Sequence, residues 1–503
     1  MGRLTRRALL ACGLIGLPAL AAGGGFAAAF AGARTGTLGR VAFTRPLAVP
    51  PLAESRLDGA GRRVFDLVAE AGETDFLPGG PTVTWGVNGG YLGPTLRAAR
   101  GERVLINVRN DLGEPTSLHW HGMHLPAAMD GGPHQEIPPG RSWAPAWTVD
   151  QRAATLWYHP HPHGRTARHV YRGLAGLFIV DDPGSEPEGL PHRYGVDDIP
   201  VIVQDKNFDR NNQLDEDSPA LSDVGVLGET IVVNGTVAPY LRVTTERVRL
   251  RLLNASNARV YRFGFADDRP FRLIATDGGL LPAPHETTRI QLSPGERAEI
   301  VVEAVPGERA VLRSYPPRIG TNFWDERFSG GDDAFDVLEL RGGSDLEPAG
   351  VLPAVLAPAP AVDLAEPAAE RAFQLTGREI NGKLMDMGRI DFASAVDTTE
   401  VWEVVNIDGT YHNFHVHDVQ FQVLSVDGQK PPPELSGWKD TVFLPPYRKV
   451  RIALHFTDHT DPDTPYMYHC HVLYHEDQGM MGQFTVVEPG QEPGPAEMPA
   501  HGA

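Results

Sequence analysis

The strongest constraint on the fold is a weak repeat of one strand-and-turn pattern, which occurs three times along the chain. Each copy carries an Asn-Gly pair that begins at Asn88, Asn234 or Asn381, so successive pairs lie 146 and 147 residues apart. A run of alternating apolar and polar residues follows each pair, at 102–110, 246–254 and 400–406. Asn-Gly favours a tight hairpin turn, and the alternation favours a strand with one buried face. The sequence therefore predicts an all-β protein made of three β-sandwich domains in tandem.

Shifts in composition mark the boundaries between these units. An Asp-Asp-Pro-Gly turn closes the first unit, and a Pro/Ala-rich stretch separates the second from the third. The last residues are rich in Gly, Pro and Glu, which is typical of a disordered tail. The predicted organisation is a signal peptide at 1–33, domains at 34–185, 186–346 and 370–489, a linker at 347–369 and a tail at 490–503.

Length and charge restrict the class of protein. At 503 residues and 54.6 kDa, the chain is too long for one ordinary hydrophobic core. The formal net charge is −19 and the isoelectric point is about 5.4, which disfavours binding to nucleic acid or to anionic membrane surfaces.

The N-terminus predicts export from the cytoplasm. Arg6 and Arg7 precede a modest apolar stretch, a pattern that resembles a twin-arginine signal. Ala-x-Ala sites follow at 31–33 and 27–29, while Pro18 weakens a membrane-spanning helix. We therefore expect recognition by the twin-arginine export machinery, cleavage, no stable membrane insertion, and a final location in the periplasm, the cell envelope or outside the cell. An uncleaved anchor is the alternative.

Cys470 is the only cysteine that follows the predicted signal peptide, so it cannot form a disulfide within the mature chain. It lies between His469 and His471, and His475 and Met480 follow. A thiolate with an imidazole and a Met is typical of a blue-copper electron-transfer site. Because successive side chains of a strand point to opposite faces, Cys470 would face one metal while its two neighbours face another.

Ten of the 19 histidines fall into four short clusters, which are His119/His121, His159/His161, His412/His415/His417 and His469/His471/His475. On a strand, residues two apart point to the same face, so each His-x-His pair can present two imidazoles to one metal. Zinc is the simplest alternative, but a zinc site needs three or four ligands and no weak axial Met. Twelve ligands of this mixed type fit several copper ions better.

The segments HWHG, HPHPHG, HNFHVH and HCHVLYHEDQGMM, which begin at 119, 159, 412 and 469, resemble the four copper signatures of the multicopper oxidases. The resemblance spans the mature chain. It implies three cupredoxin-like Greek-key domains, a three-copper cluster between the first and third domains, and a second domain that acts as a spacer. It also implies four copper ions: a type 1 copper held by His412, Cys470 and His475 with Met480 axial, a type 2 copper held by His119 and His415, and a type 3 pair held by His121, His159, His161, His417, His469 and His471.

One residue departs from the pattern of the family. Proline usually follows the first histidine of the third motif, whereas this chain has Asn413. Proline would fix φ and remove a backbone donor, and Asn does neither. The departure bears on the stiffness of this loop and on the copper potential, but not on the set of ligands.

The resemblance implies a copper-dependent oxidoreductase that couples four one-electron oxidations to the reduction of O2 to two waters. Cys470 would carry the electrons between the copper sites. The four protons need carriers near the cluster, and the family implies this role for Asp130 and Glu476. The alternative for each of these residues is a solvated surface carboxylate.

The substrate is predicted from what the chain lacks. Copper-efflux oxidases carry a Met-rich insertion that collects Cu(I), but this chain has nine Met and no such segment, and Met385 and Met387 are interpreted as core residues. We therefore predict a laccase-like enzyme (a diphenol:oxygen oxidoreductase) whose partners are O2 and a small phenol or aromatic amine. The resemblance implies that this substrate would approach the exposed edge of His475.

Three other functions stay open at this point. They are a cuprous or metal-ion oxidase in copper tolerance, a bilirubin-oxidase-like enzyme, and a non-enzymatic cupredoxin scaffold. A scaffold would have lost copper ligands, and this chain has the full set. The sequence leaves the oligomeric state open.

Overall fold

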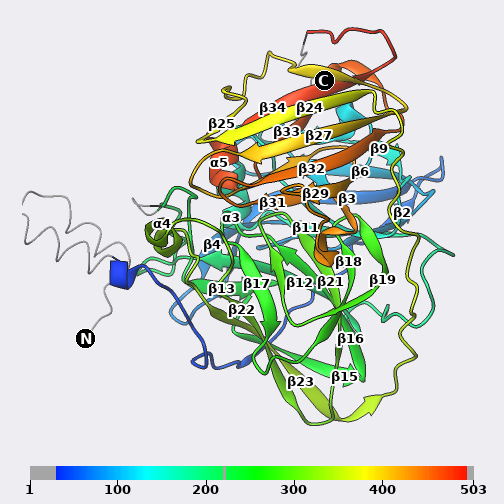
Figure 1. Cartoon of the computed structure of the whole chain (residues 1–503). Coiled ribbons are helices and arrows are strands. Elements are labelled where there is room, and N and C mark those ends of the chain that lie inside the picture. Colours follow the sequence, from blue (N-terminus) through cyan, green and yellow to red (C-terminus); the bar gives the residue numbers. More distant parts are fainter. Residues whose placement is uncertain (1–29, 219–221, 496–503) are drawn as a thin grey trace, which may run out of the picture.

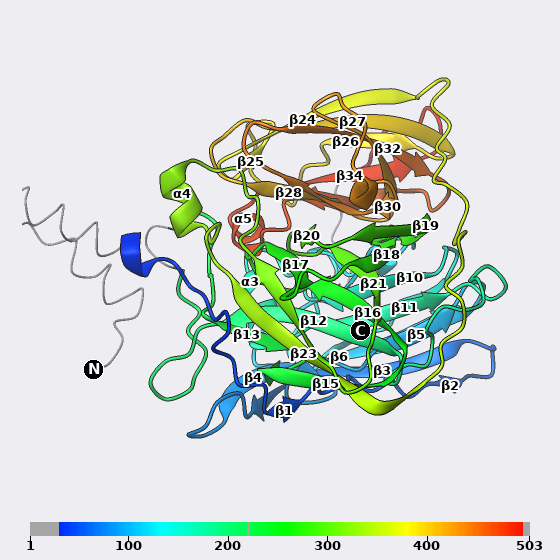
Figure 2. The same ribbon diagram turned by 60° about the horizontal axis from the view of Figure 1, so that its bottom comes forward.

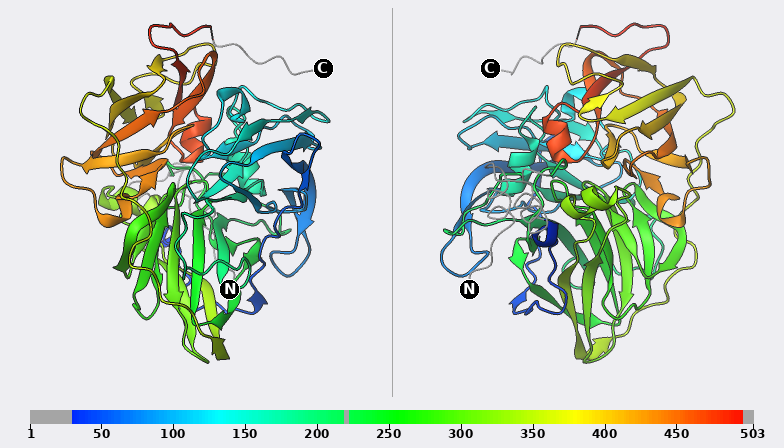
Figure 3. Two further views of the ribbon diagram at one scale, coloured as in Figure 1. Left: turned by 90° about the vertical axis from the view of Figure 1, so that its right-hand side faces the viewer. Right: turned by 60° about the vertical axis from the view of Figure 1, so that its left-hand side comes forward.

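The three repeats fold into three sandwiches, which Figure 3 shows in blue to cyan, in green, and in yellow to red. The computed structural model describes residues 30–218 and 222–495, so most of the predicted signal peptide and the end of the predicted tail lie outside the described residues. Each sandwich consists of two sheets around its own apolar core. The predicted all-β class is confirmed.

The first sandwich pairs a six-stranded sheet with a four-stranded sheet that carries histidines. The larger sheet contains β2 (Arg56–Leu57), β3 (Arg63–Thr74), β4 (Thr82–Val87), β6 (Arg103–Asn110), β8 (Ser142–Trp143) and β9 (Ala146–Thr148). The smaller sheet has the order β5 (Leu96–Ala99), β11 (Gly176–Asp181), β10 (Ala154–His159) and β7 (His119–His121).

The second sandwich consists of a seven-stranded and a six-stranded sheet. The larger has the order β14 (Thr236–Val237), β13 (Thr230–Val233), β12 (Asp198–Lys206), β16 (Arg247–Asn254), β21 (Arg297–Glu303), β18 (Phe271–Thr276) and β19 (Gly279–Thr287). The other has the order β1 (Arg45–Pro46), β15 (Pro239–Thr245), β23 (Phe335–Glu347), β22 (Arg309–Tyr315), β17 (Tyr261–Phe265) and β20 (Ile290–Leu292). The N-terminal strand β1 thus pairs with the second sandwich, although it precedes the first in the chain.

The third sandwich lies at the top of Figure 1 and consists of a six-stranded and a five-stranded sheet. The first has the order β25 (Glu379–Ile380), β24 (Ala369–Thr376), β27 (Thr398–Asn406), β32 (Lys449–Phe456), β29 (Phe421–Val426) and β30 (Trp438–Lys439). The second has the order β26 (Phe392–Ala395), β34 (Met481–Val487), β33 (Asp461–His469), β28 (His412–Val416) and β31 (Thr441–Leu444).

The described helices are short connections: η1 (Ala127–Met129), α3 (Thr166–Arg172), α4 (Phe323–Phe328), η2 (Pro433–Leu435) and α5 (Leu473–Asp477). Within the described residues, no helix is long and apolar enough to span a membrane.

The three Asn-Gly pairs form the same hydrogen-bonded turn in each sandwich. Asn88, Asn234 and Asn381 all have positive φ, between 48° and 54°, as the predicted tight turns require. Each side chain then ties the turn to a neighbouring strand. The Oδ1 atoms of these residues accept hydrogen bonds from the backbone N–H groups of Val68, Ile202 and Gln374, in that order.

The alternating strands behave differently in the first two sandwiches. In β6, Val104, Ile106 and Val108 are buried and alternate with more exposed residues, as predicted. In β16, the alternate residues Arg249 and Arg251 are buried as well. They form ion pairs, and Arg251 also donates to Thr155 of the first sandwich. The polar face of β16 is therefore a domain interface, which alternation alone does not distinguish from a solvated face.

Candidate metal centre

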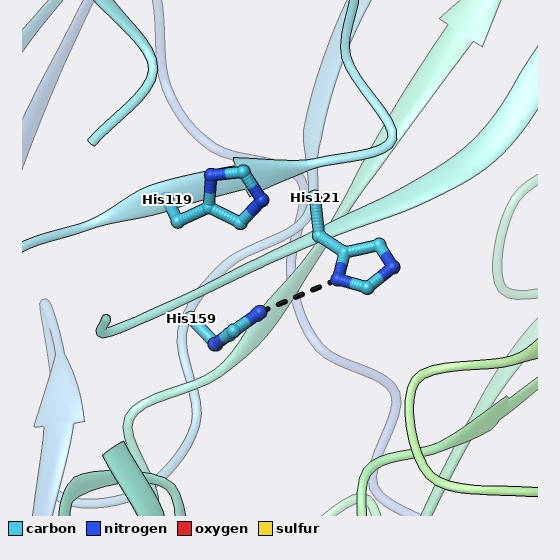
Figure 4. A group of neighbouring side chains, drawn as sticks. All are labelled: His119, His121 and His159. Atoms are coloured by element: carbon cyan, nitrogen blue, oxygen red, sulfur yellow. Dashed lines mark hydrogen bonds between the residues drawn. The ribbon is translucent and has the colours of Figure 1, made fainter. Parts of the chain in front are cut away.

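Three predicted ligands of the first sandwich come from the neighbouring strands β7 and β10, and His161 follows β10. His119 and His121 occupy alternate positions of β7, and His119 is opposite His159 at the end of β10. Figure 4 shows His121 and His159 facing each other, with 3.4 Å between Nδ1 of His121 and Nε2 of His159. All three side chains are buried. The strand period of two therefore places the predicted ligands on one face.

The third sandwich supplies its histidines from β28 and β33. His415 lies opposite His469 in the ladder between these strands, and His417 follows β28 directly. His412 lies three positions before His415 and therefore points to the other face of β28. This strand thus serves two sites, one on each side.

Six imidazoles form two groups of three, each drawn from both sandwiches. In the first group, Nε2 of His469 lies 3.2 Å from Nε2 of His161 and 3.2 Å from Nε2 of His417. In the second group, Nε2 of His159 lies 3.4 Å from Nδ1 of His121 and 3.4 Å from Nε2 of His471. Ligands that surround an ion tetrahedrally at ~2.0–2.1 Å stand roughly 3.3 Å apart. Both groups therefore have the spacing of a metal-binding trio.

Two further imidazoles complete this cluster of eight histidines. Nδ1 of His119 lies 2.9 Å from the carbonyl oxygen of Asp130, and Nδ1 of His415 lies 2.8 Å from that of Asp440. Their Nε2 atoms are buried and have no hydrogen-bond partner in the described part of the chain. A ring that donates from one nitrogen and leaves the other bare in the interior fits a metal ligand.

A second, smaller site surrounds Cys470. Its sulfur lies 3.7 Å from Nδ1 of His412 and 3.6 Å from Nδ1 of His475, and these two nitrogens are 3.0 Å apart. The opposite nitrogens are occupied, because Nε2 of His412 bonds to Asp408 and Nε2 of His475 bonds to the carbonyl oxygen of Asp223. Met480 is buried in the same apolar cluster as Cys470. One sulfur and two nitrogens converge as a soft metal site requires.

The backbone turns between the two sites at Cys470. The strand β33 ends at His469, and the rings of His469 and His471 belong to the cluster of eight while the sulfur of Cys470 faces His412 and His475. The opposite orientation that the strand pattern predicts is therefore present. One residue of backbone joins the two sites.

Burial keeps the imidazoles neutral and ready to bind a cation. Burial lowers the pKa of His161 and of His471 to about 3, and it holds the pKa values of His415 and His417 well below the ordinary value. Burial raises the pKa of Cys470 to about 12. A cation beside the sulfur would stabilise the thiolate, because an opposite charge offsets the cost of desolvation.

Both predicted proton carriers are buried against the cluster. Asp130 accepts from Nδ1 of His417 at 2.7 Å. The two oxygens of Glu476 lie 3.2 Å from Nδ1 of His469 and 3.5 Å from Nδ1 of His161. Burial alone would raise the pKa of Glu476, but the facing imidazoles hold it well below its ordinary value. Neither residue is a solvated surface carboxylate, which was the alternative from the sequence.

Two expectations from the sequence are wrong. His475 presents no exposed edge, because its ring is fully buried and the carbonyl of Asp223 covers Nε2. Met385 and Met387 are not core residues, since both are partly exposed on the segment that leads from β25 to β26. The backbone N–H of Met385 bonds to Gly479, the residue before Met480. In both cases a neighbouring loop, rather than the local sequence, determines the exposure.

Sequence reasoning also missed residues that touch the predicted ligands. Asp440 accepts from Nε2 of His121 at 3.0 Å, and Arg297 of the second sandwich holds both oxygens of Asp440. Asn413, which the sequence did single out as a departure from the family pattern, accepts from the backbone N–H of His471. No motif marks Asp440 or Arg297, because their role depends on contacts between domains.

Comparisons with known proteins agree with this geometry. Three family models described as multicopper oxidase match residues 69–185, 203–315 and 358–490. A multicopper oxidase of Staphylococcus epidermidis is 37% identical over 87% of this chain and 91% of its own length. The cell division protein FtsP of Sodalis glossinidius is 38% identical over 88% and 92%.

A solved structure shares the fold over almost the same extent. It is a laccase-like multicopper oxidase of an Ochrobactrum species, described as active towards lignin model compounds and lignosulfonate. It is 36% identical, with a TM-score of 0.80, over 88% of this chain and 100% of that chain. The predicted cupredoxin-like architecture is thereby confirmed. Family models that match more than half of the chain, close relatives and a shared fold together show that this protein belongs to the multicopper oxidases, a family of copper-dependent oxidoreductases.

Proposed function

We propose that the protein is a laccase-like oxidase with one type 1 copper, one type 2 copper and a type 3 pair. The observation that carries this proposal is the convergence of the predicted ligands into one site around Cys470 and one cluster of eight histidines. When bound, the coppers would take one electron from each of four substrate molecules and deliver the four electrons to O2, which becomes two waters.

The contacts support a place for each proposed ligand. His412, Cys470, His475 and Met480 would hold the type 1 copper, and His119 and His415 would hold the type 2 copper. The two groups of three would hold the type 3 pair: His161, His417 and His469 at one position, and His121, His159 and His471 at the other. Cys470 would link the two sites because its backbone neighbours are cluster ligands.

Two carboxylates support the supply of protons. Glu476 and Asp130 lie against different histidines of the cluster, so each can hold a proton within reach of it. Among the described residues, Oε1 and Oε2 of Glu476 and Oδ1 of Asp130 have no well-aligned hydrogen-bond partner. We assign both residues to proton transfer.

Asp408 supports a phenolic substrate. Its carboxylate is about one-fifth exposed and lies 3.2 Å from Nε2 of His412, so it connects the type 1 site to the surface. Burial alone would raise the pKa of Asp408, but its hydrogen bond and charge interaction with His412 lower it, so the group is ionised. An ionised carboxylate accepts the O–H of a phenol and can take its proton as the electron leaves. We therefore propose Asp408, instead of His475, as the residue that contacts the substrate.

The experiment is a copper count followed by oxygen consumption with a phenol series, Cu(I) and bilirubin. We expect phenol turnover that follows ease of oxidation and needs no added copper beyond refilling depleted sites. Asp408→Asn should lower phenol turnover about tenfold while the copper count stays constant, because a charged hydrogen bond contributes roughly 1.5–3 kcal/mol. The control is Asp427→Asn, which removes a carboxylate that pairs with Arg448 instead of a ligand. A chain that binds no copper would contradict the proposal.

A cuprous oxidase is the second candidate, and one observation favours it. Met385 and Met387 are partly exposed beside the Gly479–Met480 turn, and thioethers suit Cu(I). The double substitution Met385→Leu and Met387→Leu distinguishes the two functions. It should leave phenol oxidation unchanged and would abolish Cu(I) oxidation if this segment collected the ion. Robust Cu(I) turnover with phenol activity only in excess copper would make the protein a cuprous oxidase.

We also propose export through the twin-arginine machinery to the periplasm, the cell envelope or the exterior. The support is the Arg6-Arg7 pair of the sequence. The complete ligand set argues against the alternative of a cupredoxin scaffold without copper. Copper content of the purified protein tests this alternative.

A further inference from the structure

A turn of the second sandwich reaches the copper ligands of the other two. It comprises residues 293–296 between β20 and β21 together with Arg297, the first residue of β21, and all five residues are buried. Figure 2 shows β20 directly beneath β28, the strand that carries His412 and His415. Glu296 stabilises the turn through two contacts. It accepts from the backbone N–H of Ser293 within the turn at 2.7 Å and from Nζ of Lys439 in the third sandwich at 2.8 Å.

Arg297 connects this turn to two ligands through one carboxylate. Its guanidinium donates to the two oxygens of Asp440 at 2.7 and 2.6 Å, and it is fully buried. Asp440 in turn accepts from Nε2 of His121 at 3.0 Å, and its carbonyl accepts from Nδ1 of His415 at 2.8 Å. A forked guanidinium fixes the carboxylate in one orientation, and the carboxylate fixes the ring.

Gly295 touches a third ligand directly. Its φ is +86°, and a Cβ at this position would lie 3.1–3.2 Å from ring atoms of His471. That approach is closer than an added methyl group tolerates without displacing the ring. The missing side chain therefore leaves the space in which the His471 ring sits.

Asn413 links the same turn to the segment around Cys470. Its Nδ2 donates to Oγ of Ser293 at 3.1 Å and to the carbonyl of Pro294 at 2.8 Å. Its Oδ1 accepts from the backbone N–H of His471 at 2.6 Å and lies 3.6 Å from the sulfur of Cys470. A proline at this position would have no such side-chain amide.

We propose that the turn at 293–297 is a positioning element for both copper sites, so that the second domain helps to set the geometry of ligands it does not itself contribute. It acts through Arg297 and Asp440 on His121 and His415, and through Gly295 and Asn413 on His471. The inference rests on the proposed function, since it assumes copper at these histidines. Removal of a residue that hydrogen-bonds to a metal ligand typically lowers metal affinity by ~10–100-fold.

A purely structural role must be separated from this one, because buried ion pairs also join domains. Arg251 offers the matched case. It is buried in the second sandwich and pairs with Asp198 and Glu299 at 2.7 and 2.9 Å, but its hydrogen bonds reach no predicted ligand. Gly307 is the matched glycine, with φ +72° and open space around the position of a Cβ.

The experiment titrates folded apo-protein with Cu(II) against a competing chelator, beside thermal unfolding of the same apo-protein. The four variants are Gly295→Ala with its control Gly307→Ala, and Arg297→Lys with its control Arg251→Lys. Both glycine variants place a Cβ on a backbone with positive φ, and both arginine variants lose a forked ion pair. We expect copper affinity of the histidine cluster to fall about tenfold or more in Gly295→Ala and Arg297→Lys. The controls should lose stability but keep wild-type affinity.

A spectroscopic readout completes the test. The electron paramagnetic resonance signal of the type 2 copper should shift in Arg297→Lys, because Asp440 orients His415, and should be unchanged in Arg251→Lys. Equal affinities and signals within each pair would overturn the inference while leaving the proposed function intact. A wild-type chain that binds no copper would instead refute the proposed function. If Gly295→Ala fails to fold, the arginine pair decides the question alone.

Discussion

Replacement of Glu476 by Gln tests the assignment of this residue to the cluster. The carboxylate faces two ring nitrogens, Nδ1 of His469 at 3.2 Å and Nδ1 of His161 at 3.5 Å. The Nε2 atoms of these two rings face each other within the first group of three histidines, so both Nδ1 atoms carry the proton. Gln keeps the shape but offers one acceptor, and its NH2 group would face the second ring N–H. The attraction between the carboxylate charge and the two ring N–H groups is therefore lost.

The magnitude follows from that loss. We take the loss of a charge that contacts two N–H groups at the value of one hydrogen bond to a charged group, roughly 1.5–3 kcal/mol, and 1.4 kcal/mol corresponds to about tenfold. We therefore expect reoxidation by O2 to slow about 10–100-fold in Glu476→Gln. Reduction of the blue site by substrate without O2 should be nearly unchanged, because Glu476 contacts neither His412 nor Cys470 in the described hydrogen bonds and ion pairs.

The assay is stopped-flow absorption with protein of equal copper content. Enzyme reduced anaerobically by substrate is mixed with O2, and the return of the blue band is followed. The control is Glu400→Gln, which removes a buried carboxylate of the same domain that pairs with Arg371. The reasoning is refuted if reoxidation keeps its wild-type rate, or if anaerobic reduction slows instead, which would place Glu476 on the substrate side.

Four further outcomes are expected. Cys470→Ser should abolish the blue thiolate-to-copper band and the oxidase activity while the histidine cluster still loads copper; an unchanged visible spectrum would contradict this. Met480→Leu should raise the reduction potential of the type 1 copper with the blue band largely intact, because a weak axial ligand is lost; a redox titration that finds a fall would assign Met480 another role. Asn413→Pro should lower that potential, because it removes a backbone N–H that bonds to the sulfur of Cys470; an equal or higher value in the same titration would argue against this donor. Burial disfavours the charged form of His124, but its contacts with Asp418 and a second carboxylate raise its pKa to about 10. Its charge therefore stabilises the fold fully below about pH 6.5, by up to ~5 kcal/mol, and this contribution is lost as the pH rises through 10. Thermal unfolding of His124→Gln should show a deficit that shrinks over this range, and a constant deficit would exclude the ionic explanation.

The family model matches and the fold bear out much of what the motifs predicted. The three Asn-Gly turns indicated three sandwiches because the turn chemistry is local: each Asn needs only its own positive φ and one neighbouring strand. The separation of Cys470 from His469 and His471 was likewise predictable from the period of a strand. Both are short-range consequences of backbone geometry.

Exposure and partners were decided by tertiary structure. The family resemblance placed His475 at an open edge, and the sequence placed Met385 in a core. The packing of neighbouring loops reversed both expectations. Arg251 and Arg297 look like solvated charges of alternating strands, yet both are buried at domain interfaces where carboxylates neutralise them.

The amino-acid sequence by itself determined which atoms could bind metal: the imidazoles, the thiolate and their spacing along strands. Only the tertiary structure determined which nitrogen of each ring faces inward. That choice depends on what lies behind the ring, such as the carboxylate of Asp440 for His121 or the carbonyl of Asp130 for His119. These partners are separated from their histidines by 319 residues in one case and 11 in the other. The physical reason is that a hydrogen bond responds to distance in space, and packing of the three domains creates that proximity.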